Sequence, residues 1–580
     1  MTKHLPLIVL VAAVVFLPLV VPSYYLTLMN FIGLAAIIVL GLVLLTGIGG
    51  MTSFGQAAFA GIAAYTTAWF TTQAGLSPWL TLPLALVVTA LAATLIGLLT
   101  LNLSGHYLPL STLAWSLALF FLAGNMPALG GHDGIGNIPP LTIFGHAIAG
   151  KGYTWLIWAT VGLSMLSVRN LLDSRLGRAI RALPRGQILL RSFGVGTSGL
   201  KLLVFVHAAV LAALSGWLFA HMMRFVSPTP FGINASIEYL FMAVIGGAAS
   251  LWGAVLGAGA VVIAKDLLQD LVPGIAGSPG AAETIIFGLC VVLVLQYAPG
   301  GIMSRFVPRR RASQADQEAL PRARPPAGQQ IMQVTGLSRR FGGLVAVSDL
   351  NFELRAREIL AVIGPNGAGK TTLFNLLSGV LPATEGNITL QGQDLTRMPQ
   401  ARIARLGMAR TFQHVRLRPE MTVIENVALG VHRLGHKGAL TAILRLDRAE
   451  EDRLFRIAQT QLARVGLSEF AEISAGDLPQ GRQRIVEIAR ALASDPDVLL
   501  LDEPAAGLRF GEKQQLATLI RQLQADGLTV MIVEHDMTFL MNLADRVLVL
   551  NFGERIAEGA PKAVMVNPEV QRAYLGEDAA

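Results

Sequence analysis

Residues 364–372 read Gly-Pro-Asn-Gly-Ala-Gly-Lys-Thr-Thr. They follow an apolar run at 359–363 that is typical of a buried strand, and they lead into residues 373–377, which begin a predicted helix. Glycines in this context let backbone N–H groups wrap phosphates, and the helix N-terminus adds partial positive charge. Lys370 can then reach the β- and γ-phosphates, and the Thr371 hydroxyl can ligate Mg²⁺. A chance Gly-rich turn is the alternative. The pattern predicts an ATP site made by Gly364, Pro365, Asn366, Gly367, Ala368, Gly369, Lys370, Thr371 and Thr372.

A second apolar run ends in two carboxylates, in the sequence Val498-Leu-Leu-Leu-Asp-Glu-Pro. Asp502 is suited to hold Mg²⁺ through water, and Glu503 is placed to polarise the water that attacks the γ-phosphate. An acidic pair that merely opens a turn is the alternative. The spacing from the glycine-rich stretch suits two strands of one nucleotide-binding sheet, which favours the catalytic interpretation.

The composition divides the chain into two different halves. The 580 residues are 53% hydrophobic and only 14% charged, whereas soluble domains are about a quarter charged. The net charge of +8 is concentrated in basic clusters beside apolar runs, which favours a membrane orientation signal over nucleic-acid binding. The single cysteine, Cys290, excludes an intrachain disulfide.

Apolar stretches long enough to cross a bilayer dominate residues 1–303. The N-terminal run lacks a cleavage-site pattern before the next apolar segment, so it is interpreted as a first span rather than a signal peptide. Basic residues in 169–201 place that segment on the cytoplasmic side. The segment after 298 must also be cytoplasmic, because the predicted ATP-binding domain follows it. The predicted spans lie near 5–22, 24–45, 51–70, 78–101, 107–125, 152–168, 202–222, 236–264 and 283–298.

The stretch at 236–264 is too long for one simple span and is interrupted by Gly246-Gly-Ala-Ala-Ser-Leu-Trp-Gly. An even number of crossings must separate two cytoplasmic segments, so this stretch is predicted to be a hairpin or split helix with both ends outside. About ten crossings result, with the N-terminus inside. A further stretch at 46–68 is dense in small residues, which is consistent either with a place beside the translocation path or with close helix packing.

The predicted domains are a transmembrane permease domain at 1–303, a basic Pro-rich linker at 304–330 and an ATP-binding domain at 331–580. The third part resembles the ATPase of ABC importers for branched-chain amino acids. The matching runs are Leu337-Ser-Arg-Arg-Phe-Gly-Gly, Ala409-Arg-Thr-Phe-Gln-His-Val-Arg-Leu, Met421-Thr-Val-Ile-Glu-Asn-Val, Glu503-Pro-Ala-Ala-Gly-Leu, Ile532-Val-Glu-His-Asp-Met and Asn567-Pro-Glu-Val-Gln-Arg-Ala-Tyr-Leu-Gly. The resemblance implies an α/β P-loop fold of the ABC type with a helical subdomain.

The resemblance also implies roles for single residues. Phe341 would stack on adenine, Gln413 would sense Mg²⁺ and the γ-phosphate, and His535 would contact the γ-phosphate. Mg²⁺ would thus be held by Thr371, Gln413 and Asp502, with Glu503, His535 and Gln413 as the catalytic group. The family signature, which contacts the partner's ATP, corresponds to Leu478, Pro479, Gln480, Gly481, Arg482 and Gln483.

Pro479 is a departure from the general family pattern, which has a serine there. Proline has neither a hydroxyl nor an N–H, so this site is expected to depend on Gly481 and on the helix N-terminus. The departure indicates two unequal ATP sites.

The membrane half resembles a permease subunit of the same importers. The marks are Leu44-Leu-Thr-Gly, Phe54-Gly-Gln-Ala-Ala-Phe-Ala-Gly, Gly130-Gly-His-Asp-Gly-Ile-Gly-Asn-Ile-Pro, Ser174-Arg-Leu-Gly-Arg-Ala-Ile-Arg-Ala, Ala220-His-Met-Met-Arg-Phe-Val-Ser-Pro and Gly246-Gly-Ala-Ala-Ser-Leu-Trp-Gly. The family's cytoplasmic coupling helix would fall within 180–198, with a charged face near lipid head groups as the alternative. Relatives often have a glutamate after Thr-Leu-Ala-Phe-Gly, whereas this chain reads Thr112-Leu-Ala-Trp-Ser-Leu-Ala and has no carboxylate there.

The resemblance implies an ATP-driven importer subunit in a bacterial inner membrane, with its ATPase in the cytoplasm. ATP and Mg²⁺ are the implied cofactors. The implied partners are a second permease, a second ATPase and an extracytoplasmic binding protein, in a heteromer rather than a homodimer. Branched-chain or related amino acids are the expected cargo, with urea, amides or aromatic and carboxylic acids as alternatives. An exporter and a membrane-anchored regulatory ATPase are the competing classes.

Overall fold

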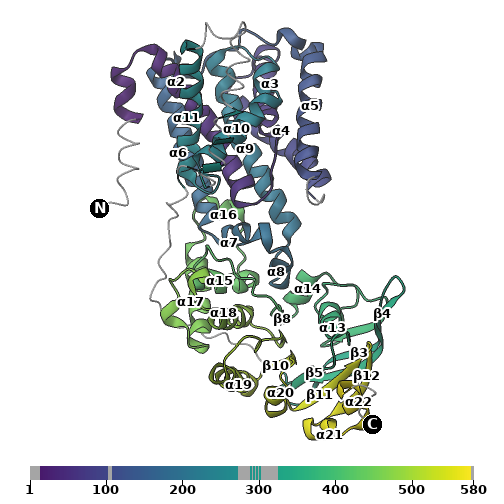
Figure 1. The fold of residues 1–580 in the computed structure, drawn as a ribbon. Coiled ribbons are helices and arrows are strands. Elements are labelled where there is room, and N and C mark those ends of the chain that lie inside the picture. Colours follow the sequence, from purple (N-terminus) through teal and green to yellow (C-terminus); the bar gives the residue numbers. More distant parts are fainter. Residues whose placement is uncertain are drawn as a thin grey trace. The chain divides into compact units, whose positions relative to one another are not determined.

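The computed structural model describes residues 14–101, 107–271 and 324–575, together with 288–289, 292–293, 296–297, 300–301 and 303. Two compact units result. Unit 1 comprises Met1–Pro184, Ser198–Pro308 and Ala439–Arg445, and unit 2 comprises Arg185–Thr197, Arg309–Gly438 and Leu446–Ala580. Each unit therefore includes a short segment from the opposite half of the sequence (Figure 1).

Unit 1 is a bundle of apolar helices. In the described ranges, six helices are long and apolar enough to cross a membrane, with α10 a shorter apolar one. Half of the predicted span near 5–22, and most of the span at 283–298 and of the linker, lie outside the described residues, so the count of ten crossings stays a prediction. Its helices include α2 (Ser23–Leu42), α3 (Gln56–Thr72), α4 (Pro78–Thr100), α5 (Tyr107–Asn125), α6 (Lys151–Leu172), α7 (Arg175–Ala182), α9 (Thr197–Met223), α10 (Ile233–Gly246) and α11 (Leu251–Leu271).

The predicted break in 236–264 is present. Helix α10 ends at Gly246, and α11 starts at Leu251 after a turn in which Gly247 has φ +112°. A Cβ on Gly246 would lie 1.8 Å from the carbonyl oxygen of Gly253, and one on Gly257 would lie 1.9 Å from that of Met242. These two close approaches make α10 and α11 an antiparallel hairpin whose backbones touch because the contacts are glycines.

The predicted span at 51–70 needs a correction at its start. A π-helical turn at Val43–Ile48 extends α2, the chain then runs without helix to Gly55, and α3 starts only at Gln56. Small residues do permit close packing here, because a Cβ on Gly216 of α9 would lie 2.0 Å from the carbonyl oxygen of Ala60. The packing interpretation of 46–68 therefore holds for α3, and a role beside the translocation path stays a prediction.

Unit 2 contains two sheets. The larger has the order β12-β11-β5-β10-β9-β8, in which β12 is antiparallel and the other neighbours are parallel. Its strands are β5 (Ile359–Ile363), β8 (Met408–Arg410), β9 (Val498–Asp502), β10 (Thr529–Val533), β11 (Arg546–Asn551) and β12 (Glu554–Gly559). The smaller, antiparallel sheet has β4 (Leu344–Arg355), β3 (Gln330–Phe341), β6 (Glu385–Leu390) and β7 (Gln393–Asp394).

The sheet explains the apolar runs seen in the sequence. β5, β9 and β10 are buried at every residue, as expected for central parallel strands covered on both faces. β10 lies between β5 and β9, so the glycine-rich loop and the acidic pair follow strands at the same carboxyl edge, where α/β sheets bind ligands.

Helices cover the sheet and form a separate helical subdomain. Helix α13 (Lys370–Leu377) packs into the core between the sheets, and α19 (Phe510–Ala525) and α20 (Met537–Leu543) cover the opposite face. The subdomain has its own core, built by α15 (Val423–Ala428), α17 (Arg448–Arg464) and α18 (Gln480–Leu492). The remaining helices of unit 2 include α8 (Gln187–Ser192), α14 (Gln400–Arg405), α21 (Pro561–Met565) and α22 (Pro568–Leu575).

Candidate ATP-hydrolysis site

The glycine-rich loop follows β5 and closes on the first turn of α13, which starts at Lys370. Two of its glycines are required by their surroundings. Gly364 has φ +153° and Gly369 has φ +95°, and a Cβ would lie 2.1 Å from the carbonyl oxygen of Leu550 or 2.4 Å from that of Ala346. Only glycine fits both the positive φ and the close backbone approach. Asn366, Gly367 and Thr371 are exposed, so the loop is open to a ligand.

Lys370 is folded back over the loop. Its Nζ donates to the carbonyl oxygens of Gly364 at 2.7 Å and Pro365 at 2.8 Å. Burial lowers the pKa of the ammonium group, and the Glu503 carboxylate opposes that shift. The side chain is therefore held at the loop by neutral acceptors, which anionic phosphate oxygens can replace as stronger ones.

Asp502 lies at the end of β9, and its two carboxylate oxygens have different surroundings. Its Oδ2 accepts from the Arg410 guanidinium at 2.8 Å, in a pair that is almost fully buried. Its Oδ1 is buried and has no hydrogen-bond partner among the residues that the structure describes. An unpaired carboxylate oxygen beside a phosphate loop fits the water shell of a Mg²⁺ ion, which usually keeps several waters and takes one or two carboxylates together with phosphate oxygens.

The three predicted catalytic side chains converge. Gln413 Nε2 and His535 Nε2 each lie 3.0 Å from Oε1 of Glu503. Glu503 itself has φ +48°, an uncommon conformation for a residue with a side chain, and its N–H donates to the carbonyl oxygen of Val533. Strain of this kind is found where a functional side chain must be aimed. The structure therefore brings Glu503, Gln413 and His535 together from three different strand ends.

Two residues that support this group were not predicted from the sequence. Glu534 is buried, and its carboxylate accepts from the N–H groups of Ala505 at 2.6 Å and His535 at 2.9 Å. It thereby ties the segment after β9 to the segment after β10, and burial raises its pKa. Arg410, whose guanidinium pairs with the Asp502 carboxylate, is the second of the two residues. A charged residue directly after an apolar, strand-like run was the available signal for Glu534.

Phe341 ends β3 and is 42% exposed. The Arg339 guanidinium covers one face of the ring, with its Cζ 4.6 Å from the ring centroid. One face of the ring therefore contacts Arg339, and the other face is available to stack on the adenine base.

Replacing Phe341 by Ala is expected to weaken ATP binding about 5- to 150-fold, because stacking on one base contributes roughly 1–3 kcal/mol. Phe341→Tyr should retain most of the affinity, since it keeps the ring. The measurement is ATP affinity of the purified transporter, with Phe552→Ala as the matched control because Phe552 is an even more exposed phenylalanine of the same domain. Equal losses in the two Ala variants would contradict a stacking role.

The signature residues span the N-terminus of α18. Pro479 is the N-cap, without a side-chain cap, and Gln480, Gly481, Arg482 and Gln483 form the first turn. Gln483 Nε2 donates to the carbonyl oxygen of Leu478 at 2.8 Å. The next residue, Arg484, donates to the carbonyl oxygen of Glu503 at 2.9 Å, which connects this helix directly to the catalytic segment.

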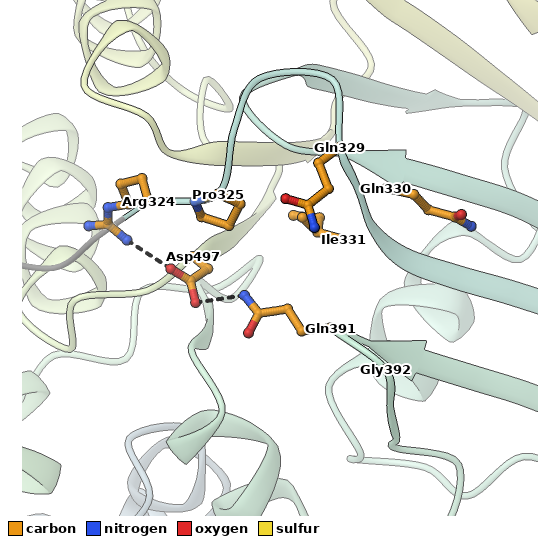
Figure 2. A pocket seen from close by; sticks show the side chains of 8 residues that line it. All are labelled: Arg324, Pro325, Gln329, Gln330, Ile331, Gln391, Gly392 and Asp497. Atoms are coloured by element: carbon orange, nitrogen blue, oxygen red, sulfur yellow. Dashed lines mark hydrogen bonds and ion pairs between the residues drawn. The ribbon is translucent and has the colours of Figure 1, made fainter.

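A separate polar cavity of about 500 Å³ lies elsewhere in unit 2 and contains none of the predicted nucleotide residues. Figure 2 shows Arg324 and Gln391 pointing at Asp497 from opposite sides. Arg324 also pairs with Asp495 at 2.6 Å. Arg324 belongs to the predicted linker, so the end of that segment is anchored on the ATP-binding domain.

Both halves of the chain match known protein families. A profile described as "Branched-chain amino acid transport system / permease component" matches residues 24–295, and one described as "ABC transporter" matches 347–506. A third, "Branched-chain amino acid ATP-binding cassette transporter", matches 554–580. The chain is thus an ABC transporter subunit in which a permease and a cytoplasmic ATPase that hydrolyses ATP are fused.

Individual relatives place it further. The "High-affinity branched-chain amino acid transport ATP-binding protein LivG" of Escherichia coli (strain K12) is 47% identical over 253 residues, which are 43% of this chain and 99% of that protein. The BraF protein of the same description from Pseudomonas aeruginosa is 43% identical, over 43% of this chain and 98% of its own length. The chain belongs to the branched-chain amino acid family of ABC transporters.

Among solved structures, one comparison is with an isolated ATP-binding cassette. A crystal structure of a nucleotide-free ATP-binding cassette from an ABC transporter is 30% identical, covering 43% of this chain and 100% of that chain, with a TM-score of 0.39.

Proposed function

We propose that this chain is a fused permease–ATPase subunit that imports branched-chain or related amino acids at the expense of ATP. The domain limits proposed are 1–303, 304–330 and 331–580. The observation that carries the proposal is the presence in one chain of a permease of this family and an ATP site whose catalytic side chains converge on Glu503.

In the proposed hydrolysis step, Glu503 accepts the developing proton of the attacking water while Gln413 and His535 hold its carboxylate and face the γ-phosphate. Lys370 and the loop N–H groups bind the phosphates, and Phe341 binds the adenine. Mg²⁺, held by Thr371, Gln413 and Asp502, would supply charge neutralisation on the phosphates.

The contacts of α8 support its proposed coupling role. Leu189 and Phe193 form a buried cluster with Phe412, the residue immediately before Gln413. Arg405 donates to the carbonyl oxygen of Gly194 at 3.0 Å, and the Arg490 guanidinium lies over the Phe193 ring. A segment of the permease sequence therefore packs beside the predicted γ-phosphate sensor, where movement of one can be transmitted to the other.

The partners proposed are a second permease and a second ATPase in a heteromer, with an extracytoplasmic binding protein, in a bacterial inner membrane and without nucleic acid. Two ATPase domains that close around two ATP molecules need two signatures. The signature of this chain is chemically unusual because it contains Pro479.

Replacing Pro479 by Ser is expected to lower the KM for ATP about two- to tenfold, because one added hydrogen bond contributes roughly 0.5–1.5 kcal/mol. The hydroxyl would serve the ATP held by the partner. The measurement is the ATP dependence of hydrolysis by the assembled transporter. Pro479→Ala is the control, since it removes the ring without adding a hydroxyl. The same gain in both variants would show that the hydroxyl is not the cause.

The cargo is tested by solute uptake into vesicles that contain the transporter with its partners and binding protein. Leucine, isoleucine and valine are offered beside urea, amides and aromatic or carboxylic acids. ATP-dependent uptake of a branched-chain amino acid supports the proposal. Intact ATP hydrolysis without uptake of any of these solutes overturns it.

A further inference from the structure

A short part of the ATPase sequence belongs structurally to the membrane unit. Residues Ala439–Arg445 cluster with unit 1, and helix α16 (Ala439–Ile443) packs against α6 (Figure 1). Asn170 Nδ2 of α6 donates to the carbonyl oxygen of Ile443 at 2.8 Å. Arg445 and Arg169 each lie 3.9 Å from the Asp173 carboxylate. These contacts hold α16 at the C-terminal end of a membrane-spanning helix.

The depth of that contact follows from the charge pattern. α6 is long and apolar enough to span a bilayer, and its C-terminal end is followed by the basic segment 169–201, which is cytoplasmic by the positive-inside rule. Asn170 lies in the last turn of the helix. Helix α16 is therefore at the boundary between the hydrocarbon core and the cytoplasmic head groups.

The outward face of α16 is apolar. Leu440 is 76% exposed and Leu444 is 66% exposed, whereas Ala442 is buried. The N–H of Leu444 donates to the carbonyl oxygen of Leu440 at 3.0 Å, so the two leucines lie four residues apart on one helical face. Isolated exposed leucines are ordinary, but a pair on one short helix that docks at a membrane boundary is not.

Two observations identify what covers this face. Leu163 and Leu166 of α6 precede Asn170 by seven and four residues and are also strongly exposed, so the span that carries α16 itself presents apolar side chains suited to lipid. The flanking sequence 433–448 carries Arg433, Lys437, Arg445 and Arg448 against one acidic residue before 449, Asp447. Apolar side chains bordered by basic ones are the composition of an interfacial anchor on anionic lipid.

We propose that α16 is a membrane-interface anchor, through which the ATPase sequence inserts Leu440 and Leu444 among the lipids of the cytoplasmic leaflet. The anchor goes beyond the proposed transport function, and it does not depend on which solute is moved. It would hold residues Ala439–Arg445 of the ATPase sequence against α6 independently of the contacts made by α8.

The test uses the full chain with its partner subunits in vesicles of phosphatidylethanolamine and phosphatidylglycerol. Cys290→Ser removes the single cysteine, and Leu440→Cys, Leu444→Cys or the control Val566→Cys then carries a fluorescent nitrobenzoxadiazole label. Val566 is as exposed as the two leucines but belongs to unit 2. Labels at 440 and 444 should be quenched severalfold more by nitroxide lipid than by aqueous iodide, and the label at 566 should show the reverse.

Two outcomes would overturn the anchor. Iodide quenching at 440 and 444 as strong as at 566 would place α16 in water, and protection from both quenchers would show that a protein partner covers it. A second measurement uses Leu440→Glu combined with Leu444→Glu. ATP hydrolysis in detergent should stay near the parent rate, while uptake in vesicles falls severalfold, and Val566→Glu should change neither. Unchanged uptake in the double variant would also contradict the proposal.

Discussion

Replacing Glu503 by Gln is expected to slow ATP hydrolysis on this chain about 10²- to 10⁴-fold, which is the usual contribution of a positioned general base. The change is nearly isosteric. The oxygen that accepts from Gln413 and lies beside His535 can remain in place, so the geometry around the site is preserved while the proton acceptor is lost. ATP affinity should change little, because the phosphates are bound by the loop and Lys370.

The measurement must separate this chain from its partner ATPase. Photoreactive azido-ATP labels each subunit, and gel separation then shows the label on this chain apart from that on its partner. A radioactive α-phosphate is retained in both ATP and ADP, whereas a radioactive γ-phosphate is lost on hydrolysis, so the ratio of γ-label to α-label on this chain shows whether its nucleotide is ATP or ADP. Glu554→Gln is a matched control on an exposed strand residue. ADP accumulation at the parent rate would exclude Glu503 as the base, and loss of labelling altogether would indicate a binding or folding defect.

The ATP-binding half could be predicted closely because its chemistry is local in sequence. The glycine-rich loop, the pair at Asp502 and Glu503, and the strands before them carry their own turn geometry and burial pattern. The helix start was placed three residues late, at 373 instead of Lys370, because the loop glycines conceal the first helical turn.

Contacts between distant segments were harder to predict. Arg410 looked like one residue of a family motif, yet its partner Asp502 is 92 residues away. The span at 51–70 was placed too early because residues 51–55 are small or apolar like the helix that follows, and periodicity alone cannot show that they are unwound. The resemblance places a coupling helix within 180–198, a range that includes α8, but no sequence pattern predicted that α16 belongs to unit 1.

Replacing Arg410 by Met is expected to destabilise the sheet around β9 by about 3–5 kcal/mol. Arg410 and Asp502 are 3% and 2% exposed, so the variant would leave a carboxylate buried without its counter-charge. The variant also loses the hydrogen bonds from Arg410 to Asn375 Oδ1 at 2.7 Å and Ser378 Oγ at 3.0 Å. Burial lowers the pKa of the Arg410 guanidinium, and the Asp502 charge opposes that shift.

Hydrogen exchange followed by mass spectrometry can measure this locally. Protection of the β9 amides should fall by about two to three and a half orders of magnitude in Arg410→Met, since each 1.4 kcal/mol is a factor of ten. Peptides from unit 1 serve as the internal reference. Arg555→Met, which breaks an exposed pair with Glu558, is the control variant and should change protection little.

The double variant Arg410→Met with Asp502→Asn distinguishes between two causes of the destabilisation. If the uncompensated charge is responsible, neutralising Asp502 should restore most of the protection, although hydrolysis stays low because the predicted Mg²⁺ residue is also altered. If the double variant is as unstable as the single one, the hydrogen bonds to Asn375 and Ser378 matter more than the ion pair. Arg410 also lies 5.3 Å from the Phe412 ring, which packs on α8. We therefore expect α8 peptides to lose protection together with β9, because the same arginine supports the Asp502 carboxylate and the aromatic contact of the proposed coupling segment.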